Sequence, residues 1–373
     1  MSAVNRLREY FKFDPKNIDI ALQLIEALAN QGDFDEALFI LNEAKQYHID
    51  EPMLISWSAH LGLATSDFKS AITAYNQLFE LGYSQTGLIV NSALAHYQLG
   101  DYRRAKKLLD SVEDLDVTNK ILKARCNAQL EETIAAITDV NSLLTLCSDE
   151  QLPEILGLLS LLYLDDAQYD LAKEYCEKTL SLDDKQFDAR LTAASLALYK
   201  IRIDDALSFI EPLDKEYPDT GRIIAMKALV YMYLQRFDLA INLYERACEK
   251  MPAHVGSRIN LGWCFFSVGE KDKAKQCFND GVKIDRTFAE SHGGLALISA
   301  LSEEWSESQV HFKRALKLDP LSPSALFARS LYFKSKGREK EAESIVSGLI
   351  NHKSELSEVT LKDIVSSFFQ KSS

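Results

Sequence analysis

The fold is decided by a stretch in the second half of the chain, QRFDLAINLYERA at residues 235–247, with Pro252 five residues beyond it. Its small residue, Ala240, belongs to a series of small residues that recurs every 34 residues. One interval is wider, with 67 residues between Ala105 and Ala172, and leaves room for one degenerate repeat of 33 residues. A fixed period indicates a repeat protein instead of the two or three globular domains that 373 residues would otherwise suggest. The series is Ala37, Ala71, Ala105, Ala172, Ala206, Ala240, Ala274, Ser308 and Ala342.

Each repeat carries the pattern of two packed helices joined by a turn. With repeats counted from residues 18, 52, 86, 120, 153, 187, 221, 255, 289 and 323, positions 8 and 20 are usually small, which lets two helices approach closely. Position 24 is bulky, as at Tyr75, Tyr244 and Phe278, and is expected to fill the wedge between successive hairpins. Glycine, which readily ends a helix in a left-handed conformation, stands at position 15 in Gly32, Gly100, Gly269 and Gly337.

This pattern resembles the tetratricopeptide repeat. Residues 235–252 carry the resemblance, and so does a second segment with Leu261, Gly262, Phe265, Gly269, Ala274, Phe278 and Asp285. The resemblance implies an all-α fold, a right-handed superhelical solenoid of antiparallel helix pairs with about 22 helices. We expect an N-terminal capping helix or half repeat at residues 1–17, three repeats at 18–119, a degenerate helical repeat at 120–152, six repeats at 153–354 and a C-terminal capping helix at 355–373.

Two parts of the chain depart from the repeat. In the repeat from residue 120, Asn127 and Asp139 stand where small residues are expected, so we predict a different helix spacing and a bend there. At the N-terminus, residues 3–13 match the second helix of a repeat whose first helix is missing. Residues 355–370 are amphipathic and are expected to cover the last hairpin; alternatively they fold into the groove or into a second copy of the protein. Their apolar residues are Leu356, Val359, Leu361, Ile364, Val365, Phe368 and Phe369.

The charge balance argues against a nucleic-acid partner. The net charge is −13, and residues 1–150 hold 13 Lys and Arg against 22 Asp and Glu. Binding to a phosphate backbone needs clustered cations, and the longest basic cluster lies among acidic neighbours. We interpret this cluster, Arg103, Arg104, Lys106 and Lys107, as a solvated helix face.

Compartment and redox state follow from what the sequence lacks. The N-terminal residues lack the apolar run of a secretory signal, and no stretch of 18 apolar residues occurs. The sequence therefore predicts a cytoplasmic protein without membrane insertion. The cysteines form no C-x-x-C pair and most fall on apolar helix faces, so we expect reduced core residues, with neither disulfides nor a zinc site. They are Cys126, Cys147, Cys176, Cys248, Cys264 and Cys277.

No motif for catalysis is found in the sequence. The seven histidines are spread along the repeats and none pairs at i, i+4. A Gly-rich phosphate loop, a G-x-S-x-G motif and an H-E-x-x-H motif are all absent. Carboxylate pairs such as Asp204 and Asp205 are interpreted as helix caps. We therefore predict a protein that is not an enzyme, with no catalytic, metal or cofactor site.

The resemblance implies that the first helices line a concave groove through repeat positions 2, 5, 9, 12 and 13. These positions are mostly apolar and aromatic, which suits apolar anchors from a partner. The alternative for each residue is that it packs between adjacent first helices, so the prediction concerns the cluster. The predicted partner-binding residues are Tyr97, Leu161, Leu164, Leu191, Leu198, Tyr199, Arg222, Leu229, Met232, Tyr233, Ile259, Trp263, Phe266 and Phe327.

The leading hypothesis is a protein-protein interaction scaffold, an adaptor or chaperone that holds a peptide or helix of another protein in the groove of the fifth to tenth repeats. A second hypothesis is a structural subunit whose groove is filled by its own C-terminal helix or by a second copy in a homodimer. A repeat regulator attached to an enzyme is not favoured, because no catalytic domain remains outside the repeats.

Overall fold

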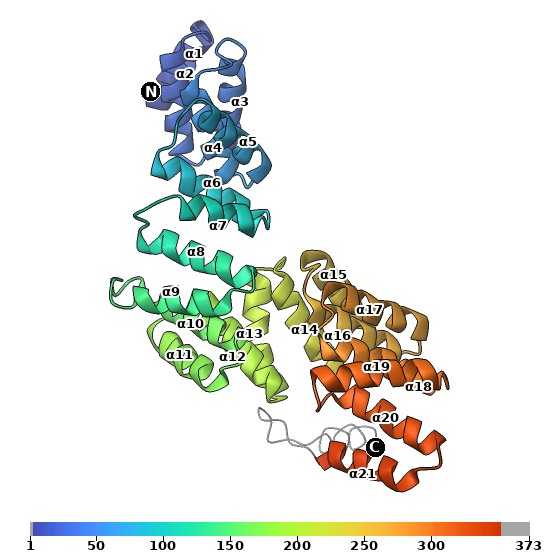
Figure 1. The fold of residues 1–373 in the computed structure, drawn as a ribbon. Coiled ribbons are helices and arrows are strands. Elements are labelled where there is room, and N and C mark those ends of the chain that lie inside the picture. The colour runs from blue at the N-terminus through green and yellow to red at the C-terminus, as the bar shows by residue number, and fades with distance from the viewer. Residues whose placement is uncertain (1–2, 352–373) are drawn as a thin grey trace. The chain divides into compact units, whose positions relative to one another are not determined.

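The computed structural model describes residues 3–351, and every secondary-structure element in this range is a helix (Figure 1). The chain divides into two compact units between Ile155 and Leu156. The N-terminal unit holds α1 (Ala3–Phe13), α2 (Ile18–Ala29), α3 (Phe34–Lys45), α4 (Pro52–Ala64), α5 (Phe68–Glu80), α6 (Thr86–Gln98), α7 (Tyr102–Asp110), α8 (Val117–Gln129) and α9 (Thr133–Leu143).

The division falls within α10 (Leu152–Asp165). The C-terminal unit continues with α11 (Tyr169–Leu182), α12 (Phe187–Tyr199), α13 (Ile203–Glu216), α14 (Gly221–Tyr233), α15 (Phe237–Lys250), α16 (Val255–Ser267), α17 (Lys271–Ile284), α18 (Ala289–Leu301), α19 (Trp305–Leu318), α20 (Pro323–Ser335) and α21 (Glu339–Asn351). The described range thus holds 21 helices. The capping helix predicted at 355–373 lies outside it.

The helices pair as hairpins through the small residues that set the period. Ala59 and Ala71, at positions 8 and 20 of the second repeat, are fully buried between α4 and α5. In the ninth repeat, the Ser308 hydroxyl at position 20 donates to the carbonyl of Ala296 at position 8 across 2.9 Å. Within each of the two units, first helices also contact the second helix of the repeat before them, as in α15 with α16 and α17 with α18. The fold is therefore an all-α solenoid of antiparallel helix pairs, as predicted.

The turn inside each hairpin uses one left-handed residue at position 15. The four predicted glycines have φ between 70° and 86°. Six turns place another residue there at φ between 55° and 63°, where a Cβ is strained. These six are Ser66, Glu131, Ala167, Ile201, Gln235 and Glu303.

The fourth hairpin begins three residues earlier in the sequence than predicted. Helix α8 begins at Val117 instead of residue 120, and Glu131 is its left-handed turn residue. Positions 8 and 20 are therefore Ala124 and Ala136, both fully buried, so this hairpin packs through small residues like the others. The prediction that Asn127 and Asp139 occupy those positions is wrong. The cause lies upstream, because α7 has only 9 residues and shortens the third repeat.

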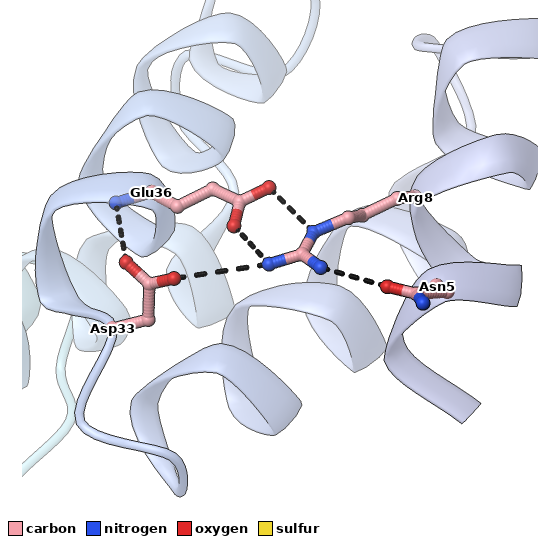
Figure 2. A network of polar contacts seen from close by, with 4 residues as sticks. All are labelled: Asn5, Arg8, Asp33 and Glu36. Carbon is pink, nitrogen blue, oxygen red and sulfur yellow. Dashed lines mark hydrogen bonds and ion pairs between the residues drawn. The ribbon is translucent and has the colours of Figure 1, made fainter. Parts of the chain in front are cut away.

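The lone helix predicted at residues 3–13 is α1, and it packs on the first hairpin. Val4 and Phe11 are buried against the apolar faces of α2 and α3. On the polar side, the Arg8 guanidinium forms a two-point contact with the Glu36 carboxylate, with Nε 2.7 Å from Oε1 (Figure 2). It also lies 3.7 Å from Asp33 and donates to Asn5 across 2.9 Å. Apolar packing and the ion pair with α3 together hold α1 on the first hairpin.

Candidate functional site

Four of the predicted groove residues belong to the core. Leu164, Leu191, Leu198 and Ile259 are each between 2% and 3% exposed. All four stand at repeat positions 5 or 12, and Leu191, Leu198 and Ile259 belong to apolar clusters between the helices. They offer almost no surface to a partner, so the prediction that they contact one directly is corrected.

The other predicted residues keep part of their surface accessible. Tyr199 is 42% exposed and Phe327 is 39% exposed. Tyr97 lies in the N-terminal unit, with its ring 5.3 Å from that of Tyr102, and the rest lie in the C-terminal unit. The partly exposed set is Tyr97, Leu161, Arg222, Leu229, Met232, Tyr233, Trp263 and Phe266.

Two of these residues meet at an apolar hollow. Trp263 on α16 and Phe327 on α20 line a cavity of about 370 Å³, for which Ser324 supplies the polar lining. The remaining lining residues were not predicted. Leu297 stands at repeat position 9, as Trp263 does, so the same rule would have found it. The others are Pro323, at the start of α20, and Val346, Leu349 and Ile350 on α21.

Trp263 is held in place by aromatic neighbours. Its ring lies 5.8 Å from that of Phe266 in an edge-to-face arrangement and 4.7 Å from that of Phe278. Phe278 is fully buried and fills the wedge between α17 and the flanking first helices. One side of the indole is thus fixed by the core, while the other faces the hollow. A fixed aromatic surface loses little conformational entropy when a partner binds.

A polar cluster lies among the aromatic residues of the fifth to seventh repeats. Arg222, on α14, makes a two-point ion pair with Asp165 at the end of α10, with distances of 2.8 and 3.2 Å. Burial lowers the pKa of Arg222, but the charge and hydrogen bonds of Asp165 outweigh this and hold that pKa above its ordinary value. Burial raises the pKa of the Tyr199 hydroxyl, which stays protonated as a hydrogen-bond donor at neutral pH. Its ring packs edge-on against Tyr169 at 5.7 Å.

Family models decide the kind of repeat. A model described as tetratricopeptide repeat matches residues 2–53 and 231–298, and a second tetratricopeptide-repeat model matches residues 153–186. The chain is a tetratricopeptide-repeat protein. The matched ranges include both the N-terminal helix and the hairpin that carries Trp263.

Relatives of these tetratricopeptide repeats are distant. Protein CTR9 homolog of Arabidopsis thaliana is 24% identical over 165 residues, which are 43% of this chain and 15% of that protein. Human protein O-mannosyl-transferase TMTC3 is 24% identical over 273 residues, 70% of this chain and 30% of that protein. The chain therefore spans less than a third of the length of the curated relatives it matches.

Solved structures agree on the architecture. The chain superimposes on the human IFIT1 dimer with m7Gppp-AAAA with a TM-score of 0.53, 17% identity and 92% coverage of each chain. It superimposes on an APC/C hetero-tetramer, Cut9-Hcn1, with a TM-score of 0.56 and 11% identity, covering 92% of this chain and 74% of that one. At these identities the likeness shows the tetratricopeptide-repeat fold alone.

Five of the six cysteines in the tetratricopeptide repeats are buried, and Cys147 is partly exposed. All six cysteines lie in the described range and have free thiols; burial raises the pKa of Cys126 to about 11 and that of Cys176 to about 12. Thiols with raised pKa values are poor nucleophiles at neutral pH. Within residues 3–351, no group of three or more His, Cys, Asp or Glu side chains is placed to hold a metal ion. No helix in that range is long and apolar enough to cross a membrane.

The basic cluster on α7 is partly neutralised. Lys106 pairs with Glu132 at the start of α9, and Lys123 on α8 pairs with Asp110 at 2.7 Å. The other three cluster residues, Arg103, Arg104 and Lys107, are exposed, as expected of a solvated helix face.

Proposed function

We propose that the protein is a non-enzymatic scaffold that binds a segment of another protein, through apolar anchors of that segment, on the inner face of its C-terminal repeats. The observation that carries the proposal is the hollow lined by Trp263, Leu297 and Phe327. A monomeric surface seldom keeps such an apolar concavity open unless it binds something.

The size and chemistry of the hollow suit one large apolar side chain. An aromatic residue buries roughly 150–250 Å². At about 25 cal/mol per Å², one such anchor contributes roughly 4–6 kcal/mol before the costs of association. Two or three anchors then support micromolar binding, about 8 kcal/mol, after those costs. The partly exposed Met232, Tyr233 and Phe266 supply further contact surface.

The cluster around Arg222 and Asp165 is the proposed contact for polar groups of the bound segment. Both side chains retain about a third of their surface, so a partner can approach the pair. The Tyr199 hydroxyl supplies a donor beside it. We propose that this cluster fixes the orientation and register of the bound segment while the hollow supplies most of the affinity.

We also propose that the protein works in a reducing compartment and that its carboxylate pairs are structural and not catalytic. The free thiols support a reducing compartment such as the cytoplasm. The carboxylate pair Asp204 and Asp205 lies in the first turn of α13 and not at its N-cap, Arg202; negative charge in a first turn is favoured by the helix dipole, which supports a structural role.

Selection from a phage-displayed library of random linear peptides tests the proposal. Selected peptides should carry aromatic or aliphatic anchors, and Phe327→Ala should weaken their binding by roughly tenfold or more, as expected for a central anchor contact. Phe39→Ala is the matched control, because Phe39 is an exposed phenylalanine on α3 in the other unit. Fluorescence anisotropy gives the affinities, and circular dichroism checks that both variants remain helical.

The proposal fails if Phe327→Ala and Trp263→Ala both bind the selected peptides as the wild type does. It also fails if the library yields no peptide with an apolar anchor. Because Trp263 contacts the core, loss of binding in Trp263→Ala counts only when its melting temperature stays near that of the wild type.

A further inference from the structure

The apolar hollow lies next to the place where the described chain ends. Helix α21 ends at Asn351, and two residues of its last turn, Leu349 and Ile350, line the hollow together with Trp263 and Phe327. The residues that follow, 352–373, are outside the described range, but their sequence is known. The segment that follows α21 in the sequence therefore starts beside the hollow.

The sequence after α21 carries one narrow apolar stripe. Leu361, Ile364, Val365, Phe368 and Phe369 are spaced i, i+3, i+4, i+7 and i+8, which places them on one face of a helix. Polar residues occupy the other positions between them. The two phenylalanines are large apolar anchors of the kind that the hollow suits.

This segment does not fit as the first helix of another repeat. Such a repeat would begin at residue 357 and place Ile364 at position 8. The preceding repeats have Ala296 and Ser330 at that position, both buried where two helices approach closely. A branched four-carbon side chain would hold the helices apart and leave the hairpin contact poorly packed.

We propose that the apolar face of residues 361–369 docks in the hollow of its own chain. Nine residues separate Asn351 from Leu361, so the ten Cα–Cα steps between them reach up to about 33–36 Å, and the hollow begins beside Ile350. A short tether gives the segment an effective concentration in the millimolar range, far above that of a free partner. The hollow's almost entirely apolar lining matches the apolar stripe.

Docking there covers two of the residues that we assign to partner binding, Trp263 and Phe327. The segment is then an internal competitor, and a partner must displace it. This regulatory consequence rests on the proposed function, whereas the docking itself does not.

Hydrogen exchange on the full-length chain tests the docking without any partner. Phe368→Asp/Phe369→Asp places two charges on the apolar stripe, and Ser366→Asp/Ser367→Asp adds the same charges off it. We expect the phenylalanine variant to lose protection at the amides of residues 323–329 and 344–351, while the serine variant exchanges like the wild type. Equal exchange in all three proteins overturns the proposal. Protection that rises with protein concentration also overturns it, because a second copy is then the occupant.

Peptide affinity separates this inference from the proposed function. If the segment fills the hollow for about nine-tenths of the time, the phenylalanine variant binds a selected peptide about tenfold tighter than the wild type. Loss of amide protection without peptide binding by either protein keeps the docking and refutes the proposed function. Peptide binding that is equally tight in both, with unchanged exchange, keeps the function and refutes the docking.

Discussion

The Asn127 side-chain amide donates a hydrogen bond to the Asp139 carboxylate across 3.1 Å, joining α8 to α9. Asn127 is only 2% exposed. In the next hairpin, the two equivalent positions hold Tyr163 and Tyr175, whose rings stack at 5.3 Å. The fourth hairpin therefore has a polar pair at the two positions where the fifth hairpin has an aromatic pair.

Asp139→Leu should destabilise the fourth hairpin because it leaves the buried Asn127 amide without this acceptor. Leaving a buried polar group unpaired costs about 1–3 kcal/mol, whereas replacing both partners with apolar groups is nearly neutral. We therefore expect Asn127→Leu/Asp139→Leu to recover most of the loss. Urea unfolding of the two variants and the wild type measures it. A single variant as stable as the wild type would contradict the prediction.

The hairpins are predictable from the sequence because close packing allows only small residues at two positions. Eight first helices begin at the residue that the 34-residue period gives, from Ile18 to Pro323. The register of the fourth repeat was not predictable in this way. The shortening of α7 to 9 residues removes three residues from the third repeat. Counting from Ala105 kept the third repeat at its full length and placed the irregularity in the fourth repeat instead.

The candidate site is only partly predictable. Repeat position 9 identifies Trp263 and would have identified Leu297, since the position faces inward in both helices. Positions 5 and 12 lie at the edges of the inner stripe, so neighbouring helices bury Leu191 and Leu198 but leave Phe327 exposed. Val346 lines the hollow from a second helix, which depends on tertiary packing at the last described hairpin and not on the repeat pattern.

Gly294→Ala should be strongly destabilising. A Cβ on Gly294 would come within 2.7 Å of three ring atoms of Phe278, which is fully buried. Overpacking of this kind costs about 1–3 kcal/mol. Gly348→Ala is the control, because nothing lies within 4 Å of the Cβ position there and α21 should gain up to about 1 kcal/mol. Thermal unfolding compares them, and equal melting temperatures would refute the clash.

Ile201→Asn should raise stability. Ile201 holds the left-handed turn between α12 and α13 at φ 55°, a conformation that is unfavourable for a β-branched residue by roughly 1–2 kcal/mol. Asparagine tolerates this conformation without the extra chain entropy of glycine. We expect the free energy of unfolding to rise by about 1 kcal/mol, reduced by the packing energy that the partly exposed isoleucine side chain contributes. A lower denaturation midpoint for Ile201→Asn than for the wild type would count against strain at this turn.

Stability should fall as the pH drops from 7 to 5, partly because of His292 and His311. Their Nδ1 atoms lie 3.3 Å apart, and burial lowers the pKa of both rings. The unfolded chain takes up protons near the ordinary histidine value of about 6.5, where the folded chain does not, so acid favours unfolding. His292→Gln/His311→Gln should flatten the dependence of melting temperature on pH in this window. A slope equal to that of the wild type would show that the pair contributes nothing.

Docking of α1 should depend on pH in a lower window, through Arg8 and Glu36. The hydrogen bond from Arg8 lowers the pKa of the Glu36 carboxyl, so its contribution is present above the ordinary value of 4.5 and is lost as the pH falls through the lowered folded-state value. Arg8→Met should therefore speed amide exchange across Ala3–Phe13 at pH 7, and this difference from the wild type should vanish in acid. Lys12→Met is the control, since Lys12 forms its ion pair with Glu9 in the same helix. A difference that persists undiminished well below pH 4.5 would assign the docking to the apolar contacts of Val4 and Phe11 alone.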